Sequence, residues 1–193
     1  DWRDVLACER TLLNLLSRLC GVASRTSRFV AMVHEVAPEV KVCDSRKTTP
    51  GLRVFEKYAV RCGGGHLHRI GLDDAVMYKD NHLASIPEDR LASTLTASIE
   101  AARRQRELRF VCVEVDRLEQ LDVVLGLADG LVDIVLLDNM ECDVLVDAVG
   151  RRDASRRSIA LEASGGVTLE TAAHIARTGV DRIAIGSITH GVK

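Results

Sequence analysis

The chain has 193 residues and a formal net charge of −2 at pH 7, with 47% hydrophobic and only 3% aromatic residues. This length and composition are typical of one soluble globular domain with a core of aliphatic side chains. The balanced charge gives no sign of a protein that binds nucleic acid or an acidic membrane. No stretch of the sequence is typical of a signal peptide or a membrane span. We therefore expect neither nucleic acid nor a membrane as a partner.

The N-terminal part of the chain is predicted to be helical. Leucines recur at helical spacing over residues 4–33, with arginine and asparagine on another face. We expect Gly21 to interrupt this helix and a second helical segment to run on to about Glu35. The chain starts without an initiator Met and inside this helix, so a part of the protein is expected to precede it.

From residue 39 onward, short β-branched runs alternate with amphipathic stretches. The predicted strands are 40–43, 75–78, 110–113, 133–137, 159–161 and 182–185, and the predicted helices between the later strands are 87–107, 117–128, 141–152 and 168–178. This alternation predicts an α/β fold with a parallel sheet that is covered on both faces. Because polar residues follow all six runs, we predict a (β/α) barrel, open and with about six strands, over residues 39–193.

Two small-residue turns near the C-terminus predict a phosphate site. Ser164-Gly165-Gly166 precedes a helix that Thr168 can cap, and Gly186-Ser187 follows the next strand. Glycines let the backbone approach a phosphate, and the N–H groups of a helix N-terminus favour an anion. Barrels often bind phosphate between two late, adjacent strands. Two ordinary glycine turns are the alternative.

Glu114 and Asp138 end consecutive strands, so we expect them to lie side by side. Two carboxylates without His or Cys partners suit Mg²⁺ that is held partly by substrate oxygens. An acid/base pair and a pair of salt bridges to nearby cations are the alternatives.

A basic cluster follows the first strand. Residues 41–69 contain seven Lys or Arg and two acids. Arg46 can grip a carboxylate or phosphate bidentately, while Lys47 supplies a point charge. The run Gly63-Gly64-Gly65 indicates a backbone crowded by a ligand or a helix, and His68-Arg69 follows it as a candidate anion site. A solvated basic face is the alternative.

Lys79 closes the second predicted strand and has two functional interpretations. It can supply a positive charge for an anionic substrate, or it can act as a Schiff-base nucleophile. His82, which follows it, has no second His at ligand spacing and is expected to form hydrogen bonds within its loop.

The six cysteines contain no CxxC pair, so a zinc site is not expected. Cys43 and Cys112 lie in apolar runs and are predicted to be buried. A core of this size needs no disulfides, and we expect a cytoplasmic location.

Taken together and in order, several of these motifs resemble the quinolinate phosphoribosyltransferase family. They are Asp44–Gly51 (DSRKTTPG), Lys57–Gly65 (KYAVRCGGG), Lys79–His82 (KDNH), Leu136–Met140 (LLDNM) and Glu162–Val167 (EASGGV). The match extends from about Glu9 to His190. The resemblance implies a Mg²⁺-dependent transfer of phosphoribosyl from phosphoribosyl pyrophosphate to quinolinate with decarboxylation, as in de novo NAD biosynthesis.

The resemblance also implies roles for individual residues. Quinolinate would be held by Arg10, reaching across a homodimer or higher homo-oligomer, and by Arg46, Lys47, His68, Arg69 and Lys79. Phosphoribosyl pyrophosphate and its Mg²⁺ would be held by Glu114, Asp138, Ser164, Gly165, Gly166, Gly186 and Ser187, and the catalytic residues would be Lys47, Glu114 and Asp138. Residues 1–38 would link to a missing or truncated N-terminal domain and contribute to the dimer interface.

Two positions depart from the family pattern. Leu67 stands where Asn is usual, and Ser45 stands where Thr is usual. Three alternatives stay open: a homologue on the same scaffold with another ligand, of the molybdenum-transport accessory type; a Schiff-base aldolase that uses Lys79; and a non-catalytic anion-binding fragment.

Overall fold

The fold is built on one parallel sheet of six strands. The computed structural model describes residues 1–84 and 86–192. The strands are β1 (Lys41–Cys43), β2 (Val76–Tyr78), β3 (Val111–Val115), β4 (Ile134–Asp138), β5 (Ala160–Ser164) and β6 (Arg182–Ala184), in the order β1-β6-β5-β4-β3-β2. All five pairings are parallel. The six strands coincide with the six predicted runs.

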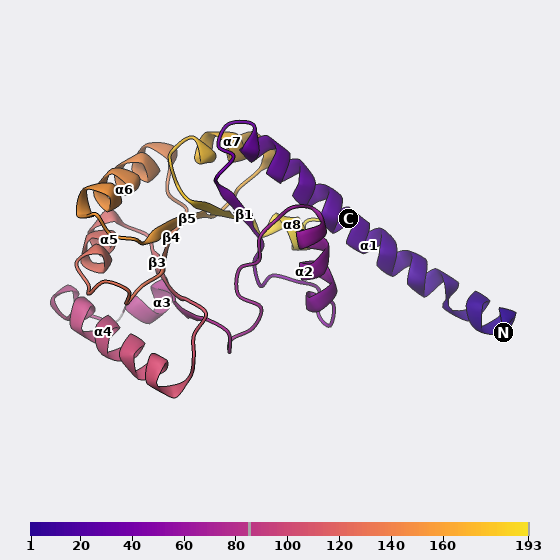
Figure 1. Ribbon diagram of the computed structural model, residues 1–193, viewed down its shortest axis with the longest axis horizontal. Helices are drawn as coiled ribbons and strands as arrows, with labels where there is room; N and C mark the ends of the chain where they lie inside the picture. Colours follow the sequence, from indigo (N-terminus) through magenta and orange to yellow (C-terminus); the bar gives the residue numbers. More distant parts are fainter. Residues whose placement is uncertain (85, 193) are drawn as a thin grey trace.

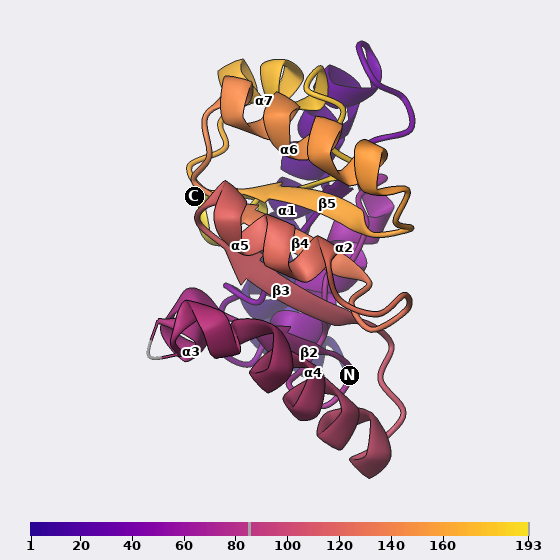
Figure 2. The same cartoon turned by 90° about the vertical axis from the view of Figure 1, so that its left-hand side faces the viewer.

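Helices surround the strands on their outer side (Figure 1). They are α1 (Trp2–His34), α2 (Arg53–Cys62), α3 (Asp80–Leu83), α4 (Glu88–Gln105), α5 (Leu118–Leu125), α6 (Cys142–Ser155), α7 (Leu169–Ala176) and α8 (Ser187–His190). Figure 2 shows α4, α5, α6 and α7 one above the other across the sheet. The four predicted helices correspond to α4–α7, whereas α2 has no counterpart among them.

The sheet curves into an open barrel, as predicted. β1 and β2 are its two edge strands. An isolated parallel bridge joins Cys43 to His66, so the segment after α2 runs beside the free edge of β1. His66 N also donates to the Val42 carbonyl at 2.8 Å. This segment carries His68 and Arg69 to the edge of the barrel.

Successive strand residues face opposite sides of the sheet, because side chains alternate along a strand. The odd-numbered residues, such as Val113, Val135 and Leu161, pack against the helices in the main core. The even-numbered Cys112, Ile134 and Leu136 form a second, smaller apolar cluster inside the barrel. Further along the same inward face the residues become polar, and Glu114, Asp138, Glu162 and Ser164 line a cavity. The inward face of the sheet therefore carries apolar side chains at the amino ends of the strands and polar, cavity-lining side chains at their carboxyl ends.

Helix α1 corrects one prediction, because Gly21 does not interrupt it. A Cβ atom at Gly21 would lie 2.7 Å from Val192 Cγ1, so the glycine lets the C-terminal segment pack against the helix. A glycine inside a helix costs about 1 kcal/mol relative to alanine, which this tertiary contact can offset. The first half of α1 projects from the barrel (Figure 1).

The Gly63-Gly64-Gly65 run is crowded by a helix, which was one of its two predicted explanations. A Cβ at Gly63 would lie 2.4 Å from the Ala23 carbonyl oxygen, and one at Gly65 would lie 2.6 Å from Thr26 Cγ2. The three glycines therefore seat the end of α2 against α1.

Cys43 and Cys112 are buried, as predicted, and all six cysteines of the chain are free thiols. Burial raises the pKa of both buried thiols. Among the described residues, no helix combines the length and the apolar character that crossing a bilayer requires.

Candidate active site

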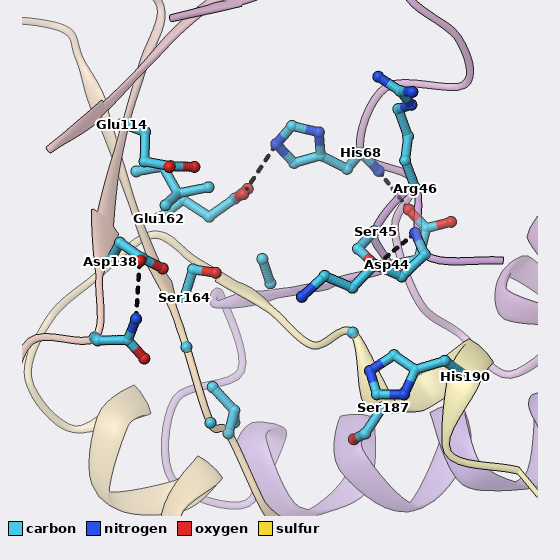
Figure 3. A pocket seen from close by; sticks show the side chains of 18 of the residues that line it. Asp44, Ser45, Arg46, His68, Glu114, Asp138, Glu162, Ser164, Ser187 and His190 are labelled. Atoms are coloured by element: carbon cyan, nitrogen blue, oxygen red, sulfur yellow. Dashed lines mark hydrogen bonds and ion pairs between the residues drawn. The ribbon is translucent and has the colours of Figure 1, made fainter. Parts of the chain in front are cut away.

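A cavity of about 1040 Å³ opens at the carboxyl ends of the strands (Figure 3). All twelve predicted site positions in the barrel line this cavity, and they lie near the carboxyl ends of the strands or in the segment beside the edge of β1. They are Arg46, Lys47, His68, Arg69, Lys79, Glu114, Asp138, Ser164, Gly165, Gly166, Gly186 and Ser187. The fold therefore brings together residues that are up to 141 positions apart in the chain.

Arg10 does not belong to this cavity. It lies on the exposed part of α1, where its side chain is 86% exposed and contacts Glu9 at 4.0 Å. Its expected action in the site of a neighbouring subunit stays a prediction.

A fully buried carboxylate, Glu162, lies at the base of the cavity between two cationic or ionisable partners. Its Oε1 is 3.0 Å from His68 Nε2, and its Oε2 accepts from Arg182 Nε at 2.5 Å. Burial alone would raise the pKa of the Glu162 carboxyl, but the contacts with His68 and Arg182 outweigh burial and the pKa lies below its usual value. Glu162 belongs to a predicted motif, yet sequence reasoning assigned it no role; a charged residue inside an apolar strand was the available signal.

His68 is held from several sides. Its backbone N–H donates to Asp44 Oδ1 at 2.8 Å, and the other oxygen of Asp44 accepts from Lys57 Nζ at 2.7 Å. The ring also meets Phe110 edge-on, with centroids 5.4 Å apart. Burial raises the pKa of the Asp44 carboxyl, against the opposing effect of Lys57. These contacts keep the histidine ring at one place in the cavity wall.

Lys79 and Glu114 form an ion pair at the cavity rim. Lys79 Nζ lies 2.7 Å from Glu114 Oε2 and 3.0 Å from Oε1. The salt-bridge interpretation of the two strand-end carboxylates therefore holds for Glu114. Asp138 accepts a hydrogen bond from Asn139 Nδ2 at 2.8 Å, and within residues 1–84 and 86–192 it forms no salt bridge. Asp138 is thus the carboxylate that remains open to a ligand.

The turn after β5 has a backbone that only glycine fits. Gly165 has φ +100°, and a Cβ atom there would lie 2.1 Å from Asn139 Oδ1. Asn139 itself has φ +53° and donates its backbone N–H to the Ser164 carbonyl at 2.8 Å. Thr168 then caps α7 in a reciprocal pair with Thr171. The turn brings bare backbone to the cavity wall.

The buried polar atoms that lack a hydrogen-bond partner gather at this cavity. Among the described residues they are Arg25 Nε, Arg46 Nε, His68 Nε2, Glu162 Oε1 and Ser187 Oγ, and all five residues line it. The histidine and glutamate atoms face each other as an ion pair. The other three are desolvated donors, and a buried donor is costly unless a ligand or water supplies an acceptor.

Arg25 and His190 are cavity residues that sequence reasoning missed. Arg25 lies on α1, with its guanidinium 5.7 Å from the Phe29 ring. No motif marks it, because its place depends on how α1 packs on the barrel.

The cations of the cavity influence one another. Burial, followed by the charge of Arg46, lowers the pKa of the Arg69 guanidinium. A bound anion would relieve this repulsion, because an opposite charge favours the charged form of a group. Within the described residues, no group of three or more His, Cys, Asp or Glu side chains is arranged to hold a metal ion. The arrangement is suited to a polyanionic ligand with a carboxylate or phosphate at each end.

The two departures from the family pattern have simple structural explanations. Leu67 packs against the core, and its carbonyl accepts from Arg109 Nη2 at 3.3 Å. Ser45 Oγ accepts the Lys47 backbone N–H at 3.1 Å. The hydroxyl at position 45 therefore shapes the loop that carries Arg46 and Lys47.

Comparison with known proteins agrees with this geometry. Residues 22–193 match the family model described as quinolinate phosphoribosyl transferase, C-terminal domain. The chain is 42% identical to the carboxylating nicotinate-nucleotide pyrophosphorylase of Mycobacterium leprae over 99% of this chain and 63% of that protein. It is 41% identical to the probable enzyme of the same name from Bacillus subtilis, over 98% and 61%.

Solved structures show the same relationship. The nicotinate-nucleotide pyrophosphorylase of Francisella tularensis aligns with a TM-score of 0.83 and 38% identity, over 99% of this chain and 63% of that one. NadC from Streptococcus pyogenes aligns with a TM-score of 0.84 and 37% identity, over 99% and 62%. The chain thus spans somewhat less than two thirds of the length of these relatives.

Proposed function

Because the chain belongs to the family of the C-terminal domain of quinolinate phosphoribosyl transferase, we propose that this protein transfers phosphoribosyl from phosphoribosyl pyrophosphate to quinolinate. The products are nicotinate mononucleotide, pyrophosphate and CO₂, as in de novo NAD biosynthesis. One observation carries the proposal: a single cavity is lined both by a cluster of cations and by two small-residue turns.

The cationic residues of the cavity suit quinolinate, which is a dianion. Arg46, Lys47 and Arg69 supply positive charge for the two carboxylates, and His68 lines the same cavity. Arginine can bind a carboxylate through two parallel hydrogen bonds. The unpartnered Arg46 Nε supports this role. Lys79 lies at the rim, where Glu114 neutralises part of its charge.

The glycine turns suit the 5′-phosphate of the second substrate. Gly165 and Gly166 expose backbone, the buried Ser187 Oγ lacks a partner, and Gly186 opens the second turn. Backbone N–H groups at helix N-termini favour phosphate. The ribose and pyrophosphate then extend toward Asp138 and Glu114.

The carboxylates Glu114 and Asp138 fit a Mg²⁺ ion that arrives with its substrate. They lie on the adjacent strands β3 and β4, and Mg²⁺ usually binds through one or two carboxylates together with substrate phosphates and water. The ion would neutralise the departing pyrophosphate. Mg²⁺ is therefore the proposed cofactor.

The reaction follows from these charges. The C1–O bond of the ribose breaks, its electron pair leaves with pyrophosphate, and the cationic side chains stabilise the negative charge. Asp138 stabilises the positive charge that develops on the sugar. The quinolinate ring nitrogen forms the new bond to C1. The adjacent carboxylate then leaves as CO₂, the electron pair of the broken bond stays on the ring carbon beside the positively charged nitrogen, and this carbon takes a proton from water to give the product. Lys47, which lines the cavity, is the proposed catalytic cation for the reacting carboxylate.

We also propose that the protein works as a homodimer or higher homo-oligomer. Six large apolar side chains on the projecting part of α1 are between 49% and 79% exposed: Trp2, Val5, Leu6, Leu12, Leu13 and Leu16. Exposed apolar patches of this kind mark interaction surfaces. Arg10 lies among them and would be delivered to a partner. The six free cysteines are in keeping with a cytoplasmic location.

The test is product formation from quinolinate, phosphoribosyl pyrophosphate and Mg²⁺, with protein made from the full open reading frame. We expect nicotinate mononucleotide that disappears when Mg²⁺ is chelated. Asp138→Asn should lower kcat/KM by about a hundredfold or more, because it removes a charge that acts on the transition state. Well-folded protein that makes no product contradicts the proposal and favours a homologue with another ligand.

A further inference from the structure

An ion pair with a buried carboxylate and a partly exposed arginine lies outside the cavity, and it connects three helices to the loop that carries Arg46 and Lys47. Its carboxylate is Glu56 on α2, which is fully buried, and its cation is Arg18 on α1. Neither residue lines the cavity. The Arg18 Nη2–Glu56 Oε1 distance is 2.9 Å and the Nε–Oε1 distance is 3.1 Å.

The same carboxylate binds the loop itself. Glu56 Oε2 accepts the backbone N–H of Thr49 at 3.1 Å, and Oε1 accepts the Thr49 hydroxyl at 2.8 Å. Arg18 Nη2 also donates to Thr49 Oγ1 at 3.2 Å. Thr49 is therefore held by both members of the ion pair, two residues after Lys47.

Arg18 further reaches the C-terminal segment. It donates to the Thr189 carbonyl at 2.6 Å and to the carbonyl of Val192. Thr189 is fully buried, and its hydroxyl donates to the Lys47 carbonyl at 2.6 Å. It lies two residues after Ser187. Figure 1 shows α1, α2 and α8 meeting on one side of the barrel.

These contacts form a closed set that we call the clamp: Arg18, Thr49, Glu56 and Thr189. The clamp grips the cationic loop at Lys47 and Thr49 and grips the second small-residue turn through α8. A buried carboxylate with four hydrogen bonds is stable in one arrangement, because each lost partner leaves a desolvated charge. The clamp therefore fixes the position of the loop at Lys47 relative to the turn before Thr189, although these two residues are 142 positions apart in the chain.

We propose that Glu56 and Arg18 are positioning residues, which act through Thr49 to hold Arg46 and Lys47 at the spacing that the aromatic dicarboxylate requires. The inference rests on the proposed function for the identity of that ligand. It predicts that loosening the clamp weakens the binding of quinolinate more than it slows the chemical step. Misplacement of a binding loop by about 1 Å is sufficient for a large loss.

The mildest test removes one hydroxyl. Thr49→Val keeps the shape and deletes the hydroxyl contacts with Glu56 and Arg18, whereas Thr49→Ser keeps the hydroxyl. We expect Thr49→Val to raise the KM for quinolinate about tenfold, with kcat changed less than about threefold, since loss of a charge-assisted hydrogen bond has this size. Thr49→Ser should restore the wild-type KM. Thr96→Val, the same change on α4 outside the cavity lining, is the matched control.

Two further measurements separate this inference from the proposed function. Glu56→Gln keeps the size of the side chain and should accelerate amide hydrogen exchange in residues 45–51, while Glu39→Gln at an exposed position should not. This readout needs no turnover, so it tests the clamp even if the wild-type protein makes no product. Calorimetry with quinolinate alone should show that Thr49→Val weakens quinolinate binding by the same factor by which it raises the KM.

The outcomes are distinct. Faster exchange together with a selective rise in the KM for quinolinate supports the proposal. Unchanged exchange in Glu56→Gln overturns the clamp. Faster exchange without a change in the KM for either quinolinate or phosphoribosyl pyrophosphate shows a purely structural role and overturns the positioning of the loop. The same conclusion follows if Thr49→Val and Thr49→Ser raise the two KM values equally.

Discussion

The fully buried Glu162 carboxylate lies 3.0 Å from His68 Nε2 in the cavity (Figure 3), while its second oxygen accepts a hydrogen bond from Arg182. A negative charge beneath a site for anions opposes ligand binding unless it organises the cations around it. Three segments depend on this one carboxylate: the 66–69 loop, β5 and β6. Glu162 therefore contributes both to the stability of the barrel and to the position of His68 in the site.

Glu162→Gln should lower the free energy of unfolding by about 3–5 kcal/mol at neutral pH, because it leaves Arg182 without its buried partner. The loss should depend on pH. The folded-state pKa of Glu162 lies below the ordinary value of 4.5, so its contribution is present above pH 4.5 and is lost as pH falls through the lowered folded-state pKa.

Urea unfolding of wild type and Glu162→Gln at several pH values measures this effect. The difference between the two proteins should be constant above pH 4.5 and shrink below it. Glu119→Gln at an exposed position of α5 is the control. A difference that stays constant down to the lowest pH at which both proteins fold contradicts the assignment.

Gly165→Ala should damage phosphate binding. The substitution places a Cβ 2.1 Å from Asn139 Oδ1 at a residue with φ +100°, so the turn must move. We expect the KM for phosphoribosyl pyrophosphate to rise at least about tenfold, on the scale of one lost charge-assisted hydrogen bond. Gly150→Ala is the control, since nothing lies within 4 Å of its Cβ and its helix should become slightly more stable. Equal kinetics for the two variants would exclude a role for this turn.

Arg25→Met should weaken the binding of an anionic ligand while leaving the fold intact. Arg25 lines the cavity and its buried Nε has no hydrogen-bond partner, so a ligand gains one donor there. Calorimetry with inorganic pyrophosphate should show an affinity about tenfold lower, on the scale of one hydrogen bond to a charged group. Arg28→Met, at an exposed position one turn nearer the end of α1, should bind as wild type. Equal affinities for both variants show that Arg25 has no contact with the anion.

Lys79 should not form a Schiff base. Its amine lies 2.7 Å from Glu114 Oε2, and this ion pair occupies the amine that would have to attack a carbonyl carbon. Treatment with borohydride and a carbonyl substrate should therefore leave the mass of the protein unchanged. A mass increase that is absent in Lys79→Arg would revive the aldolase alternative.

Much of the candidate site could be predicted from local sequence. Ser45, Arg46 and Lys47 follow a β-branched run, and so do Lys79, Asp138 and Gly186. Parallel strands present their carboxyl ends at one edge, so residues that follow strands converge wherever the sheet forms. The strands themselves were predictable, because continuous apolar runs of β-branched residues favour buried parallel strands.

Other features escaped prediction for a physical reason. Gly21 appears in the sequence as a helix breaker, whereas its role is to admit Val192, 171 positions away. Arg25 and Arg18 lie on the same helix, but one reaches the cavity and the other reaches the clamp, and only the packing of α1 decides this. Glu162 could be recognised as an unusual charge within a strand, but its partners could not.

Periodicity and backbone preference act over a few neighbouring residues, so local sequence was sufficient to predict the succession of strands and helices, the residues at the strand ends and the small-residue turns. The pairing of charges depends instead on the folded chain: Glu162 meets His68 and Arg182, Glu56 meets Arg18, and Lys79 meets Glu114. Those pairs join residues 20 to 94 positions apart, and they form only when the curved sheet and its helices have brought distant segments together and excluded water from between them.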